Sequence, residues 1–99
     1  MNYRISHKAE IDLEDIWFYT FENWSVKQAD IYITTIFKTI KKISKDPQTG
    51  KDYSHIRKGY LRIRSQKHFI FYKINRYEKC VDIIRILHER MDLNERIAQ

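Results

Sequence analysis

The spacing of apolar residues changes once along this chain, at the breaker cluster Asp46-Pro47-Gln48-Thr49-Gly50. Before the cluster, apolar residues recur at steps of four and three, the period of an amphipathic helix: Ala29, Ile33, Ile36, Ile40 and Ile43. After Gly59 the apolar and polar residues alternate, which indicates strands. The chain therefore divides into a mainly helical half and a half built from strands.

The full pattern predicts an α+β fold in a single domain of residues 1–99. Its expected order is an N-terminal strand, an antiparallel helical hairpin, then a three-stranded antiparallel meander. The corresponding segments are a strand at 2–6, helices at 7–23 and from the Ser25 cap to the breaker, strands at 60–64, 67–74 and 80–88, and a helical turn at 92–97. The hairpin is expected to cover one face of the sheet.

Strand alternation then assigns residues to the two sheet faces. The side towards the helices is expected to hold Leu61, Ile63, Ile70, Tyr72, Ile74, Ile84 and Ile86. The outward side is expected to hold Tyr60, Arg62, Arg64, Phe69, Phe71, Val81, Ile83, Arg85 and Leu87. This second set mixes apolar side chains with arginines, so it predicts either a partner surface or a face over which residues 89–99 fold back.

Positive charge is concentrated in the same region. The net charge is +6, and residues 57–77 hold seven Lys and Arg side chains without one Asp or Glu. Such segregation attracts an acidic partner, either a nucleic acid or an acidic peptide, although a basic face kept for solubility has the same composition.

Other chemistry finds little support in the sequence. The single cysteine, Cys80, excludes an internal disulfide, and the four histidines lack zinc-ligand spacing, so no metal or cofactor is expected. The carboxylates Glu10, Asp12, Glu14 and Asp15 are interpreted as partners of the helix dipole. Aromatic residues at Trp17, Phe18, Phe21 and Trp24 are interpreted as hairpin core and helix-edge packing. Neither a signal peptide nor a membrane span is predicted, which favours a cytoplasmic protein.

Five segments, taken in order, resemble the RelE/ParE superfamily of type II toxin–antitoxin toxins, and the ParE branch most closely. They are Ser6-His7-Lys8-Ala9-Glu10-Ile11-Asp12-Leu13, the Asp46-Pro47 and Gly50 loop, Ile56-Arg57-Lys58-Gly59-Tyr60, His68-Phe69-Ile70-Phe71-Tyr72, and Ile84-Arg85-Ile86-Leu87-His88-Glu89-Arg90-Met91-Asp92. Leu61 departs from the pattern, because members of the family have a basic residue there.

The resemblance implies a non-catalytic toxin that inhibits DNA gyrase, blocks replication and is neutralised by a cognate, ParD-like antitoxin with an acidic C-terminal segment. The residues expected to bind that segment are Arg62, Arg64, Phe69, Phe71, Ile83 and Arg85, and those expected to bind the target are Arg90, Met91 and Asp92. The outward patch would also allow the free toxin to form a homodimer, a question that the sequence leaves open.

The alternative is a RelE-type, ribosome-dependent mRNA endonuclease. His88 would then act as acid or base, the outward arginines Arg62, Arg64 and Arg85 would hold phosphate, and Lys58 or Tyr72 would lie nearby. Strand parity instead places His88 towards the helices, which favours a structural role. The strip of Tyr60, Phe69 and Phe71 is open to two interpretations, a platform for unpaired bases or an anchor for the antitoxin.

Overall fold

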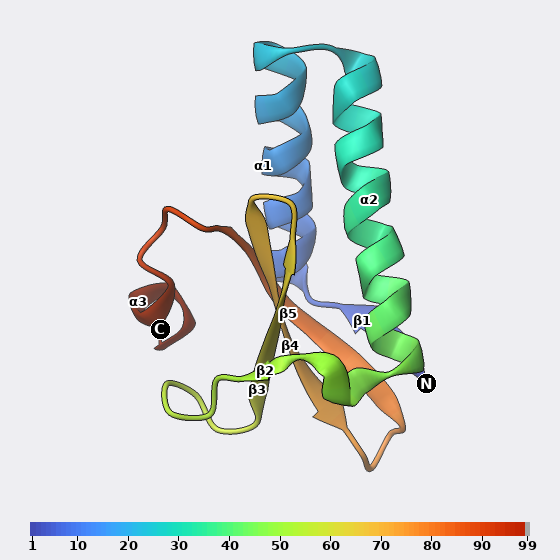
Figure 1. Cartoon of the computed structure of the whole chain (residues 1–99), viewed down its shortest axis with the longest axis vertical. Helices are drawn as coiled ribbons and strands as arrows, with labels where there is room; N and C mark the ends of the chain where they lie inside the picture. The colour runs from blue at the N-terminus through green and yellow to red at the C-terminus, as the bar shows by residue number, and fades with distance from the viewer. Residues whose placement is uncertain (99) are drawn as a thin grey trace.

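The computed structural model describes residues 1–98 as two long helices packed on one face of a five-stranded sheet, with a short C-terminal helix on the other face (Figure 1). The elements in chain order are β1 (Asn2–Ile5), α1 (His7–Asn23), α2 (Val26–Lys45), the 3-10 helix η1 (Pro47–Thr49), β2 (Lys51–Asp52), β3 (Tyr60–Ser65), β4 (His68–Asn75), β5 (Cys80–His88) and α3 (Leu93–Ala98). The predicted α+β class, the helical hairpin and the antiparallel meander are confirmed.

Serine caps start both long helices, as their sequence predicts. The Ser6 side chain accepts a hydrogen bond from the Ala9 backbone N–H at 3.0 Å, and Ser25 accepts one from Gln28 N–H at 3.0 Å. Only Trp24 and Ser25 separate the two helices, so α1 and α2 run side by side in opposite directions (Figure 1). None of the helices in residues 1–98 is long and apolar enough to cross a membrane.

The sheet has the order β1-β5-β4-β3-β2, which adds two pairings to the expected meander. β1 lies parallel to β5 and forms an edge of the sheet, and the two-residue β2 pairs with β3 at the other edge. The main core lies between this sheet and the hairpin. Its fully buried members include Ile36, Ile40, Ile43, Ile70 and Tyr72.

A β-bulge in β5 overturns part of the predicted face assignment. Phe71 pairs with Arg85 but the next residue, Tyr72, pairs with Ile83, so Ile84 is an extra residue that no residue of β4 matches. The side chains of β5 that precede the bulge therefore point to the opposite face of the sheet from the one that simple alternation assigns to them. Ile83 and Val81 were expected on the outward side, but both are fully buried in the core beneath the helices.

The outward face of the sheet is largely covered by the end of the chain. A second core contains Tyr53, Phe71, Leu87 and Ile97, and α3 contributes the last of these. Figure 1 shows α3 on the far side of the sheet from the hairpin. The alternative that residues 89–99 fold back over the apolar part of this face therefore holds for the described residues, because Leu93 and Ile97 pack there.

Candidate functional site

Three side chains on the uncovered part of the outward face form a cationic platform, defined as Arg62, Phe69 and Arg64. The Arg62 guanidinium carbon lies 4.3 Å from the centre of the Phe69 ring, and that of Arg64 lies 4.5 Å from the same centre. Arg62 also lies 5.1 Å from the Tyr53 ring. These cation–π contacts hold two positive charges beside one apolar ring.

Strand register places the platform on one face. In the β3–β4 pair, Arg64 stands opposite Phe69, and Arg62 stands opposite Phe71. Opposed residues of antiparallel strands point to the same face, so the ring and both guanidiniums share it. Lys51 of β2 stands opposite Arg62, which adds a third cation to this surface.

Phe71 is buried beneath the platform, in the core against which Phe69 packs, and is not part of the exposed surface. The Phe71 side chain is fully buried, with its ring centre 5.2 Å from that of Tyr53 in an edge-to-face contact. Tyr53 in turn donates a hydrogen bond from its hydroxyl to Asn94 of α3. The prediction of Phe71 as an exposed anchor is wrong because loop 53–59 and α3 cover it.

Arg85 is also absent from the platform, because it is paired with α1. Its guanidinium donates two hydrogen bonds to the Asp12 carboxylate at 2.8 and 2.9 Å, and the Ile86 N–H donates a third at 2.9 Å. Both side chains are mostly buried, at 17% and 11% exposure. The hydrogen bonds to Asp12 raise the pKa of Arg85. Because Asp12 belongs to α1 and Arg85 to β5, this ion pair holds the helix against the strand.

A groove of about 990 Å³ opens beside this ion pair, between the hairpin and the ends of β4 and β5. Its lining combines aromatic, acidic and basic side chains, including Asp15, Tyr19, Trp24, Tyr32, Lys67, His68, His88, Arg90 and Met91. Two of the residues predicted to bind the target, Arg90 and Met91, therefore line the groove. The third, Asp92, instead caps α3, accepting a hydrogen bond from Glu95 N–H at 3.1 Å.

Two histidines of the groove lining, His68 and His88, have ring centres 5.0 Å apart. The Tyr32 hydroxyl accepts a hydrogen bond from Lys67 N–H, so its own proton is free to be donated to His68 Nδ1, 2.7 Å away. Burial and the neighbouring His88 lower the pKa of His68 to about 4, so this ring is neutral near pH 7. His88 Nδ1 accepts a hydrogen bond from Arg90 N–H at 3.1 Å, which orders the segment after β5.

One ion pair joins the platform to the groove. Arg64 contacts Glu89 at 2.9 Å, and the Glu89 N–H donates to the Lys67 carbonyl at 2.9 Å. The hydrogen bond from Arg64 lowers the pKa of Glu89. The edge of the groove at Arg90 and Met91 is called the groove lip. It follows Glu89 directly in the chain, so the platform and the groove lip are neighbouring parts of one surface.

Comparison with known proteins identifies the family. A family model described as the ParE toxin of the type II toxin–antitoxin system parDE matches residues 3–93. The chain belongs to the ParE toxin family. It is accordingly a ParE-type toxin of a type II toxin–antitoxin system.

Curated relatives and a solved structure agree with this membership. The chain is 39% identical to Toxin ParE1 of Caulobacter vibrioides over 90 residues, which are 91% of each chain. It is 33% identical to Toxin ParE1 of Mycobacterium tuberculosis over 95 residues, 96% of each. A structure titled "Chromosomal ParDE TA system from P. aeruginosa" matches with a TM-score of 0.76 at 16% identity, over 89% of this chain and 95% of that one, and confirms the fold.

In this ParE-family chain the structure brings together Arg62, Arg64 and Phe69 from the six residues predicted to bind the antitoxin. It buries Phe71 and Ile83 and pairs Arg85 with Asp12. In residues 1–98 no group of three or more His, Cys, Asp or Glu side chains is placed to hold a metal ion.

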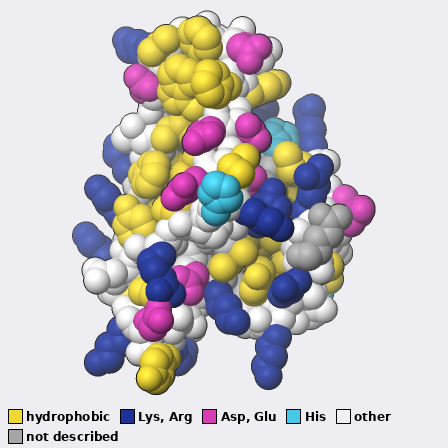
Figure 2. Space-filling model, turned by 180° about the vertical axis from the view of Figure 1, so that it is seen from behind, with side chains coloured by type: hydrophobic (Ala, Val, Ile, Leu, Met, Phe, Trp, Pro, Cys, Tyr) yellow, Lys and Arg dark blue, Asp and Glu magenta, His cyan; other side chains and the backbone are white. Residues whose placement is uncertain are grey.

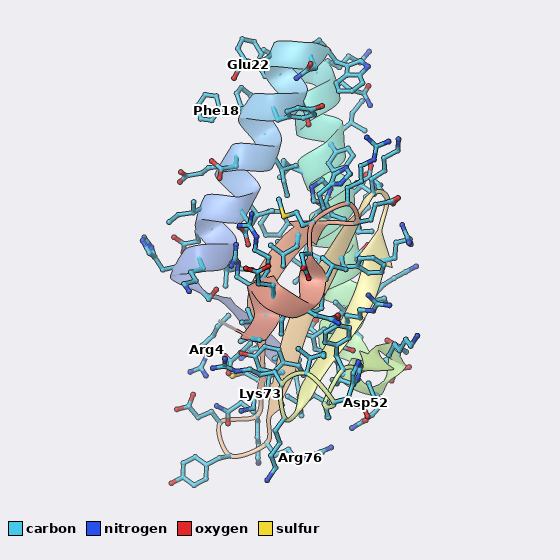
Figure 3. The ribbon with its side chains drawn as sticks, turned by 90° about the vertical axis from the view of Figure 1, so that its left-hand side faces the viewer. Arg4, Phe18, Glu22, Asp52, Lys73 and Arg76 are labelled. Atoms are coloured by element: carbon cyan, nitrogen blue, oxygen red, sulfur yellow. The ribbon has the colours of Figure 1, made fainter. Side chains whose placement is uncertain are left out.

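Sequence reasoning missed an exposed aromatic cluster at the end of the hairpin. Phe18, Phe21 and Trp24 are 56%, 42% and 67% exposed, so these residues are not hairpin core, whereas the expected helix-edge packing is present where Trp17 contacts Phe18 and Phe21. Trp17 stacks on Phe21 with ring centres 5.3 Å apart and donates a hydrogen bond to Asp30. Figure 3 shows Phe18 projecting from α1, and Figure 2 shows hydrophobic and acidic side chains together at this end.

Proposed function

We propose that this ParE-type toxin inhibits DNA gyrase, blocks replication in the cytoplasm and is neutralised by a cognate antitoxin. The match of the ParE toxin family model across residues 3–93 is the observation that carries the proposal. Inhibition is proposed to occur by binding, without catalysis.

The antitoxin is proposed to bind the cationic platform through an acidic segment that also carries apolar side chains. A flexible segment loses chain entropy when it binds, so it needs both charge pairing and an apolar anchor. Arg62 and Arg64 supply the charge, and the Phe69 ring between them supplies the apolar contact. Phe71, Ile83 and Arg85 serve this surface indirectly by holding the strands beneath it.

Target binding is proposed at the groove lip, where Arg90 and Met91 lie. Met91 is 40% exposed, and Arg90 is exposed beside it. Because the Arg64–Glu89 pair places the platform directly next to this lip, an antitoxin bound to the platform would obstruct the approach of the target. Neutralisation then needs no change in the fold of the toxin.

The charge of the platform provides a direct test of antitoxin binding. The double variant Arg62→Glu, Arg64→Glu is expected to weaken binding of the cognate antitoxin about tenfold, equivalent to about 1.4 kcal/mol. Its affinity should also depend less on salt, because fewer attractive ion pairs remain to be screened. Isothermal titration calorimetry at two salt concentrations measures both effects.

The matched control reverses two exposed charges in the β4–β5 turn, Arg76→Glu and Lys79→Glu. This control should bind the antitoxin with nearly the affinity of the unmodified toxin. Equal losses in the two double variants would show that only net charge matters and would remove the platform from the proposal.

The histidine pair in the groove is the observation that favours a second candidate, a ribosome-dependent mRNA endonuclease. That chemistry needs cations around the scissile phosphate. Of the arginines expected in that role, Arg85 is held by Asp12, and Arg62 and Arg64 lie on the platform, outside the lining of the groove that contains His68 and His88. Translating ribosomes mixed with the toxin should therefore leave their mRNA intact, whereas cleavage at the ribosomal A site would favour the endonuclease.

A further inference from the structure

A row of lysines follows one side of α2. Lys38, Lys41, Lys42 and Lys45 are spaced by three, one and three residues, which places them on one face of the helix, and all four are exposed. The opposite face of the same turns carries Ile36, Ile40 and Ile43, which are fully buried. These four lysines are called the lysine stripe.

Local electrostatics accounts for only half of the stripe. Lys42 and Lys45 lie in the last turn of α2, where cations interact favourably with the helix dipole, but Lys38 and Lys41 precede that turn. Like charges three or four residues apart destabilise a helix by roughly 0.2–0.5 kcal/mol per pair. None of the ion pairs between described side chains includes a lysine of the stripe.

Further positive charge lies at the same end of the molecule. The N-terminal ammonium of Met1 donates a hydrogen bond to the Ser44 carbonyl at 2.9 Å, beside Lys45. Met1, Ser44 and Glu78 line one hollow, which places the β4–β5 turn, with Arg76 and Lys79, next to the end of α2. Glu78 is itself paired with Arg4. Figure 2 shows Lys and Arg side chains along the left-hand edge of the molecule, the side of α2, and at its lower end.

Charge is also distributed unevenly along the sequence. Residues 7–30 carry six Asp and Glu against two Lys, whereas residues 38–79 carry thirteen Lys and Arg against three Asp and Glu. Figure 3 shows Glu22 and Phe18 at one end of the molecule and Lys73 and Arg76 near the other. A polyanion is expected to approach with the lysine-bearing end foremost.

We propose that the lysine stripe binds the sugar–phosphate backbone of duplex DNA without reading its sequence. The stripe spans seven residue steps of α2, about 10 Å at 1.5 Å per residue. Three base-pair steps also rise about 10 Å along the axis of duplex DNA, at about 3.4 Å each. Lysine is a flexible point charge, suited to contacts with phosphates that fix position rather than sequence.

The composition of the stripe itself, between Lys38 and Lys45, favours DNA over an acidic protein. Protein partners usually require an apolar or aromatic anchor, as Phe69 provides on the platform. No exposed apolar side chain lies between Lys38 and Lys45. The stripe is on the hairpin and the platform is on the other face of the sheet, so DNA and antitoxin have separate surfaces. This inference does not depend on gyrase being the target.

Fluorescence anisotropy with a short labelled duplex of arbitrary sequence tests the proposal. The logarithm of the association constant should fall with the logarithm of salt concentration, with a slope of about −3.6 if four phosphates are contacted. Changing the stripe by Lys38→Gln, Lys41→Gln, Lys42→Gln and Lys45→Gln should weaken binding at low salt about tenfold or more and bring the slope towards zero. The four corresponding Lys→Arg changes should retain binding, because they keep the charge.

The control removes the same number of exposed charges elsewhere, by Lys8→Gln, Lys27→Gln, Lys58→Gln and Arg96→Gln. This control should bind DNA much more tightly than the stripe variant. Equal weakening in the two variants would overturn the proposal, as would a wild-type toxin that binds polyglutamate as tightly as DNA. Unchanged antitoxin affinity of the stripe variant would show that it remains folded.

Discussion

Substitution of Phe71 by alanine is expected to lower the free energy of unfolding by about 4 kcal/mol. The Phe71 side chain is fully buried among Tyr53, Leu87 and Ile97, so its removal leaves a cavity between the sheet and the covering segments. Urea unfolding followed by circular dichroism measures the change.

Phe69→Ala is the matched comparison, since the two rings lie two residues apart on the same face of β4. Phe69 is only half-buried, so its replacement should cost much less stability and act mainly on antitoxin affinity. If Phe71→Ala unfolded at the same urea concentration as the unmodified toxin, α3 and loop 53–59 would not cover this face as described.

The second large effect is expected at the ion pair between α1 and β5. Arg85→Ala should destabilise the toxin by about 3 kcal/mol, because it leaves the mostly buried Asp12 carboxylate without its main partner. Asp12→Ala should have a similar effect, and it also deprives Ile86 N–H of its acceptor. Thermal and urea unfolding of both single variants measure these losses.

The double variant Asp12→Ala, Arg85→Ala distinguishes pairing from separate effects. Its loss should be clearly smaller than the sum of the two single losses, as for residues in direct contact. Arg4, which pairs with Glu78 and Asp82 on the surface, supplies the control, and Arg4→Ala should change stability little. Strict additivity of the Asp12 and Arg85 losses would contradict a coupled pair.

Local pattern was sufficient to predict most of the elements but not all of their neighbours. The helices followed from the apolar spacing of α1 and α2 and from the capping residues Ser6 and Ser25. The parallel pairing of β1 with β5 joins residues about 78 positions apart, which no local spacing reports. β2, with two residues, is too short to show alternation.

The face assignment failed where one residue changes the parity of a strand. Counting back from Leu87 places Ile83 outwards, but the extra residue Ile84 at the bulge turns Ile83 towards the helices. The sequence carries a signal at that position, because the apolar residues Val81 and Ile83 alternate in one phase and Ile84 and Ile86 in the other. The adjacent pair Ile83-Ile84 marks the change of phase. The platform was predictable because β3 and the first half of β4 pair without a bulge, so Arg62, Arg64 and Phe69 keep their parity.

The partners of Asp12 and Arg85 were beyond sequence reasoning for a different reason. Asp12 lies in a run of acids near the start of α1, where interaction with the helix dipole is sufficient to explain a carboxylate. Its true partner is 73 residues away, at a stretch of β5 that β1 leaves unpaired. The pair forms because α1 packs against that edge of the sheet, a long-range contact that local sequence patterns do not predict.

Inhibition of gyrase by binding, without turnover, is tested most directly by titrating purified toxin into a gyrase supercoiling reaction with relaxed plasmid. Supercoiling should fall in proportion to added toxin, reach its minimum when toxin and gyrase are close to equimolar, and return when the cognate antitoxin is supplied. Full supercoiling at a large molar excess of folded toxin would contradict this account.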